Sequence, residues 1–215
     1  MERKHFWLLF CMVLLALATS AQAADPGKNS RDKLFGPQDV WTLPFEALSA
    51  CEAKNPTSTT CLTQVMKQAG ASKQALALNK MLEGDGYMSA FQPMGRIDLA
   101  TCFFPSRANS NEVLFMVGGS PSLVSSELDA DINIKADPAY PGLKKKFPDL
   151  ELWTSGASFA KMDILPNGGQ RFVFEYPLVN GCHACAQAGD ALIAHDFDPD
   201  GTYKGPRLVR LKPAK

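Results

Sequence analysis

The chain has 215 residues, of which 46% are hydrophobic and 20% are charged, and its 22 basic residues balance 22 acidic residues. This composition is too apolar for an intrinsically disordered protein, and it lacks the basic excess that is typical of nucleic-acid binding. We therefore expect a folded globular protein that does not bind nucleic acid.

Residues 1–23 have the pattern of a cleavable export signal. Two basic residues precede an apolar run over 6–17, and Ala21-Gln22-Ala23 then matches a small-residue cleavage site. The apolar run is too short for a membrane-spanning helix, although an uncleaved anchor is the alternative. The sequence predicts a mature chain that begins at Ala24, is periplasmic or secreted, and has no stable membrane span.

Apolar residues at helical spacing predict three helices, over 42–54, 60–70 and 72–84, after a polar leader. Thr42 is the expected cap of the first helix and Ser72 of the third, because both residues precede a helical pattern and carry a side-chain oxygen.

Beyond Gly86 the apolar residues recur with a period of two, which indicates strands. The expected strands cover 97–104, 112–117, 122–128, 150–153, 159–165, 171–179, 188–197 and 203–211. A loop is expected over 129–141 and a helical turn over 143–147. Pro177 lacks an N–H, which predicts that its strand lies at a sheet edge or has a bulge there.

These elements predict an α+β fold in which N-terminal helices are followed by a mainly antiparallel β-meander. We divide the chain into the signal at 1–23, a helical hairpin with a β region at 24–130, and an antiparallel β region at 131–215. Two of the three helices would be joined by a Cys51–Cys61 bridge, because cysteines of exported proteins tend to pair.

The one compact motif that could carry chemistry is Gly181-Cys182-His183-Ala184-Cys185. Haem attachment requires a histidine directly after the second cysteine, and a thioredoxin-like centre requires the first thiol at a helix N-terminus. This pair instead lies between two predicted strands. We therefore predict a Cys182–Cys185 disulfide turn that presents Gly181, His183 and Ala184 to a binding partner. Cys102 then has no nearby cysteine in the sequence with which to pair, and the spacing of the cysteines leaves other disulfide pairings open.

Zinc is another candidate ligand of this motif, with Cys182, Cys185 and His195 as ligands and Asp196 or Cys102 as the fourth. No second Cys or His pair completes a zinc-finger spacing. The alternation of His195 with neighbouring apolar residues instead predicts a packed histidine.

Asp196, Asp198 and Asp200 match the first half of a calcium-binding loop. The twelfth position, where a bidentate glutamate would stand, is Arg207. This favours a hairpin turn, and the sequence leaves calcium binding open. Neither a serine-nucleophile elbow nor a glycine-rich phosphate loop is present, so we assign no catalytic residue and expect no cofactor.

Residues 143–205 resemble the Ivy-type periplasmic inhibitors of vertebrate lysozyme. The resemblance consists of a short helix, the Pro148-to-Trp153 segment, two strands, a loop with a histidine between cysteines, and an Asp-x-x-Gly strand end before Gly205. The resemblance implies that Cys182 and Cys185 close a loop that presents His183 to the active-site cleft of lysozyme, although this turn is shorter than the corresponding loop of the family.

Together these features predict an exported, non-enzymatic binding or inhibitor-like protein with a protein partner in the cell envelope. Two alternatives stay open at this point. One is a thiol-disulfide or metal-dependent enzyme that uses Cys182 and Cys185, and the other is a structural component of the envelope. The sequence specifies neither the partner nor the oligomeric state.

Overall fold

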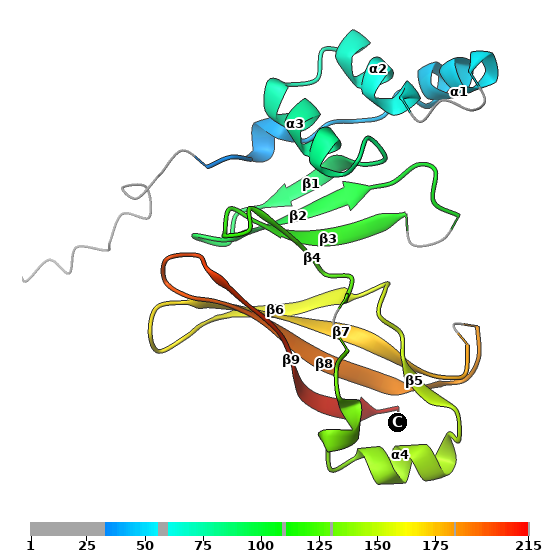
Figure 1. Cartoon of the computed structure of the whole chain (residues 1–215), viewed down its shortest axis with the longest axis vertical. Coiled ribbons are helices and arrows are strands. Elements are labelled where there is room, and N and C mark those ends of the chain that lie inside the picture. The colour runs from blue at the N-terminus through cyan, green and yellow to red at the C-terminus, as the bar shows by residue number, and fades with distance from the viewer. Residues whose placement is uncertain (1–32, 56–59, 109–110, 130, 183, 215) are drawn as a thin grey trace, which may run out of the picture. The chain divides into compact units, whose positions relative to one another are not determined.

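The computed structural model describes residues 33–55, 60–108, 111–129, 131–182 and 184–214 (Figure 1). Three α-helices lie in the N-terminal part of these residues. They are α1 (Phe45–Lys54), α2 (Cys61–Gln68) and α3 (Lys73–Met81), and a 3₁₀ turn, η1 (Pro37–Asp39), precedes them. The three predicted helices are confirmed. The predicted export signal lies outside the described residues.

The predicted caps have different outcomes. Ser72 caps α3, because its hydroxyl accepts a hydrogen bond from the Ala75 N–H at 2.9 Å. Thr42 does not cap α1, which begins three residues later with Pro44 at the cap position. The physical reason is that a residue before a proline disfavours helical backbone angles, so Leu43 cannot form a first helical residue.

The first sheet is an antiparallel meander in the order β1 (Tyr87–Gln92), β2 (Asp98–Phe103), β3 (Glu112–Val117) and β4 (Leu123–Ser125). Helices α1–α3 lie along one side of it in Figure 1. Leu78 and Leu82 belong to one buried apolar cluster with Met88 and Cys102 of the sheet. The sequence did not predict β1. A register shift between Met88 and Ala90 interrupts the period-two pattern on which a strand prediction rests.

A short helical segment connects the two sheets. It contains the 3₁₀ turn η2 (Ile134–Ala136) and the helix α4 (Tyr140–Lys146), so the predicted loop over 129–141 is partly helical. Ile134 and Leu143 are only 9% and 5% exposed and belong to the largest apolar cluster. The segment is therefore anchored to the core.

The second sheet contains β5 (Leu150–Leu152), β6 (Ser158–Ile164), β7 (Gln170–Asn180), β8 (Gln187–Phe197) and β9 (Tyr203–Pro213). Its order is β5-β7-β8-β9, and β6 also pairs with β7. All pairings are antiparallel. Together with the helices, this confirms the predicted α+β class with a β-meander.

Pro177 does not lie on an edge strand, because β7 pairs with β8 on one side and with β5 and β6 on the other. Of the two predicted alternatives, an edge strand or a bulge, the structure therefore has the bulge. On the side of β7 that faces β5 and β6, strand β5 pairs with residues from Leu178 onward and strand β6 pairs with residues up to Glu175. Pro177 therefore lies in the gap between β5 and β6. There its missing N–H breaks no ladder bond. A bulge occurs next to it, between Leu178 and Val179.

The two sheets share one core. Leu99 and Met116 of the first sheet cluster with Phe172 and Phe174 of the second, and all four are at most 5% exposed. Gln170 adds a buried polar link, because its side chain accepts from the Ile97 N–H at 2.7 Å and donates to two carbonyls of the 94–97 segment. All of the described residues belong to one compact unit. The division at residue 130 stays a prediction.

Candidate functional site

The sequence-predicted Cys182–Cys185 pair forms the tip of the β7–β8 hairpin. The two Sγ atoms lie 2.11 Å apart and the Cα atoms 5.0 Å apart. The Cys185 N–H donates to the Cys182 carbonyl at 3.0 Å, and the Asn180 N–H donates to the Ala186 carbonyl at 3.1 Å. Every described residue from 181 to 187 is exposed, and His183 lies outside the described residues. The pair thus closes a turn between strands, as predicted.

The base of this turn is supported by the chain that follows α4. The Asp149 N–H donates to the Asn180 side-chain oxygen at 2.9 Å. Gly181 adopts a left-handed φ of +83°, and a Cβ there would lie 3.3 Å from the Asp149 Cβ. Both the backbone angle and the close approach favour glycine at this position. Gly181 therefore shapes the turn, whereas Ala184 lies on its exposed part.

The other cysteines that the structure describes have structural environments. The Sγ atoms of Cys51 and Cys61 lie 2.04 Å apart and join the end of α1 to the start of α2. Cys102 is buried in β2, and burial raises the pKa of its thiol to about 12. A thiol with this pKa stays protonated at neutral pH and is neither a nucleophile nor a ready metal ligand.

His195 is buried at 1% exposure in a network of hydroxyl groups. The Tyr176 hydroxyl donates to the Ser126 carbonyl, so its oxygen accepts from His195 Nε2 at 3.1 Å. His195 Nδ1 then accepts from the Tyr203 hydroxyl at 2.7 Å. Burial lowers the pKa of His195 to about 4, so it is neutral at pH 7. This confirms a packed histidine.

The structure does not assemble the zinc ligands considered above. His195 pairs with Phe172, near the end of β7 that is opposite to the Cys182–Cys185 turn. Among the described residues, no group of three or more His, Cys, Asp or Glu side chains is arranged to hold a metal ion.

The three aspartates of the calcium-like motif contact other protein groups. Burial raises the pKa of Asp196, but hydrogen bonds from Arg171 at 2.7 and 2.8 Å and from Arg207 at 3.1 Å outweigh it and lower the pKa. Asp198 pairs with Lys204, and Asp200 accepts from the Thr202 N–H at 2.9 Å. The motif therefore serves hairpin geometry and cross-strand pairing.

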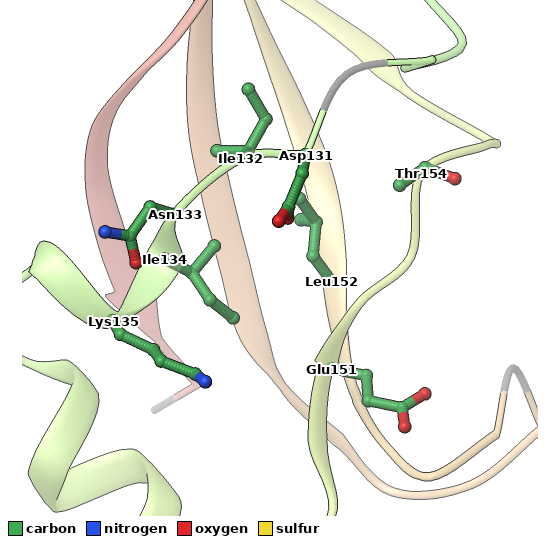
Figure 2. Close-up of a pocket in the computed structure, with 8 residues that line it drawn as sticks. All are labelled: Asp131, Ile132, Asn133, Ile134, Lys135, Glu151, Leu152 and Thr154. Carbon is green, nitrogen blue, oxygen red and sulfur yellow. The ribbon is translucent and has the colours of Figure 1, made fainter.

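A cavity of about 400 Å³ lies between the 131–135 segment and β5 (Figure 2). Ile134 and Leu152 give it an apolar part, and Asp131, Lys135 and Glu151 give it charges of both signs. Its lining contains no histidine or cysteine, so no nucleophile–base pair of the Ser–His or Cys–His type is present. The sequence did not predict this cavity, because its two walls are separated by α4.

Comparison of the chain with models of known protein families, with curated proteins and with solved structures found no match. The resemblance of residues 143–205 to Ivy-type inhibitors therefore stays a prediction. Within the described ranges, no helix is both long and apolar enough to cross a membrane.

Proposed function

We propose that this chain is an exported binding protein of the inhibitor type, and that its Cys182–Cys185 turn contacts a protein partner. The observation that carries the proposal is the exposed, disulfide-closed tip of the β7–β8 hairpin. Loops on a rigid scaffold are the usual places for recognition residues. Here the scaffold strands are each 11 residues long.

Several contacts organise the turn before any partner arrives. The disulfide, the Cys185-to-Cys182 hydrogen bond and the Asp149-to-Asn180 hydrogen bond each restrict the backbone. A loop that is ordered in advance loses less conformational entropy on binding than a flexible loop. The turn is therefore suited to contribute binding free energy despite its small size.

The redox alternative receives less support from the surroundings of the cysteines. Cys182 follows the end of β7, so no helix N-terminus favours its thiolate. Catalytic thiols need such a helix terminus or cationic neighbours to lower their pKa.

Vertebrate lysozyme is the first probe, because the resemblance of residues 143–205 implies it. The test compares Ala184→Arg, which places a long cation on the exposed turn, with Ala53→Arg, the same change on exposed α1. We expect the wild-type chain to inhibit lysis of bacterial cells by lysozyme and to bind it in calorimetry. Ala184→Arg should weaken binding by about tenfold or more, and Ala53→Arg should not.

The proposal for lysozyme is wrong if calorimetry and the lysis assay both show no interaction. It is also wrong if Ala53→Arg and Ala184→Arg weaken binding equally, because the effect would then be one of net charge. His183→Ala is the variant that tests the role implied by the resemblance, and an unchanged affinity would contradict that role.

The enzyme alternative has its own measurement. A thiol-disulfide oxidoreductase should reduce insulin with dithiothreitol as electron donor, and Cys182→Ser should abolish that activity. We expect no acceleration above the uncatalysed rate. Turnover that depends on Cys182 would replace the binding proposal with a redox function.

A further inference from the structure

A second cavity of about 400 Å³ lies on the first-sheet side of the molecule, away from the residues that the sequence singled out. It is bounded by the turn after α3, the segment after β2, and the end of β4. Its floor is apolar, because Leu82, Phe104 and Phe115 are 8%, 4% and 7% exposed. Met81, at 42% exposure, offers a further apolar surface to a ligand. We call this cavity the acidic groove, for the charges described next.

Four carboxylates and one guanidinium line the acidic groove. Glu127 is paired with Arg107 at 3.1 Å. Glu83, Asp85 and Asp129 are exposed, and in the part of the chain that the structure describes none of the three takes part in an ion pair. The groove therefore combines an apolar floor with an excess of unpaired negative charge.

Arg107 shows which chemistry this groove accommodates. Its guanidinium carbon lies 3.8 Å from the centroid of the Phe104 ring, and its Nη1 lies 3.1 and 3.2 Å from the two Glu127 oxygens. An aromatic face and a carboxylate thus already hold a cation inside the groove. Phe115 and the three unpaired carboxylates offer the same two kinds of contact to a second cation.

We propose that the acidic groove binds a cationic segment of a partner protein, in which arginine or lysine residues alternate with apolar residues. The cations would contact Glu83, Asp85 and Asp129, and the apolar side chains would cover Met81 and the floor. This charge complementarity distinguishes the occupant from nucleic acid or an acidic protein surface. The carboxylates border the groove without converging on one point, and no metal-holding group of three exists among the described residues.

A fluorescein-labelled five-residue peptide that alternates arginine and leucine is the probe. We expect saturable one-to-one binding in fluorescence anisotropy that weakens as sodium chloride is raised. A peptide with serine in place of leucine should bind more weakly, because it cannot use the apolar floor. A peptide with glutamate in place of arginine should not bind. Equal binding of all three peptides, or no binding at millimolar concentration, would overturn the proposal.

The decisive variants remove equal charge at different places. The triple variant Glu83→Gln/Asp85→Asn/Asp129→Asn should weaken peptide binding by about tenfold. The control Glu46→Gln/Glu52→Gln/Glu151→Gln removes the same charge from exposed positions outside the groove and should leave the affinity unchanged. Equal weakening by both variants would show a non-specific charge effect and would contradict the proposal.

An independent NMR measurement on the methionine methyl groups tests where the peptide binds. In a spectrum of protein labelled with ¹³C at the methionine methyl groups, the peptide should shift the Met81 signal. The signal of Met66, which is 0% exposed among the helices, should not move. A shift pattern that spares Met81 would place the peptide elsewhere and overturn the proposal. Neither result depends on the Cys182–Cys185 turn, so the two proposals stand or fall separately.

Discussion

The buried His195 should make the protein lose stability in mild acid. The histidine accepts the Tyr203 hydrogen bond through Nδ1, the atom that would have to take up a proton, and burial lowers its pKa from 6.5 to about 4. As the pH falls below 6.5, the unfolded chain binds a proton that the folded chain does not. The free energy of unfolding therefore falls, and the loss is complete only near pH 4. Between pH 7.5 and 4.5 it amounts to about 2.5 kcal/mol.

The assay is urea unfolding of residues 24–215 at pH 7.5, 6.5, 5.5 and 4.5, followed by tryptophan fluorescence. His195→Gln keeps a neutral hydrogen-bonding side chain and cannot titrate. Over the same pH range, the free energy of unfolding of this variant should therefore fall by about 2.5 kcal/mol less than that of the wild type. His183→Gln, which changes the other histidine within residues 24–215, should keep the wild-type pH dependence. If wild type and His195→Gln lose equal stability in acid, the reasoning about His195 is wrong.

Three further predictions concern stability at neutral pH. The double variant Cys51→Ser/Cys61→Ser removes the disulfide between two cysteines that are 10 residues apart in sequence. It should lower the free energy of unfolding by about 3 kcal/mol, and an unchanged melting temperature under oxidising conditions would contradict this. Gly189→Ala should lower the free energy of unfolding by more than about 3 kcal/mol, because its Cβ would lie 2.2 Å from the Lys212 carbonyl oxygen. The control Gly142→Ala, where a Cβ on α4 would meet no atom within 4 Å, should leave stability unchanged or raise it slightly. Gln170→Leu should cost about 2–4 kcal/mol in urea unfolding, since it leaves the buried Ile97 N–H without its partner, and a loss below 1 kcal/mol would show that the link between the sheets is dispensable.

The fold was predictable where local patterns were regular. Strands β6, β7, β8 and β9 follow from alternating apolar residues between turn residues. All four form as predicted, with β6 paired to β7 and β8 paired to β9. Strand β1 was missed because a bulge after Met88 breaks the alternation. Pro177 predicted either an edge strand or a bulge, and the structure has the bulge, with Pro177 at a gap between β5 and β6 on the other side of β7. That gap is a property of the sheet and has no local sequence signal.

The candidate sites differ in the same way. The Cys182–Cys185 turn is contiguous in sequence, so its spacing and its flanking strands revealed it. The acidic groove joins residues such as Glu83, Phe104 and Asp129 from segments that are distant along the chain. Single exposed carboxylates carry no sequence signal of their own. Only the antiparallel arrangement of β2, β3 and β4 brings them to one surface.

The shared core of the two sheets has a consequence for the order in which the protein is made. Ser120 hydrogen-bonds to Gly201 and Tyr203, and Leu99 and Met116 pack against strand β7, so the first sheet is completed by residues that leave the ribosome much later. Until β7 is available, the apolar face of the first sheet has no cover, and exposed apolar sheet faces promote aggregation. A nascent chain that ends before residue 170 should therefore need a holding chaperone to stay in solution.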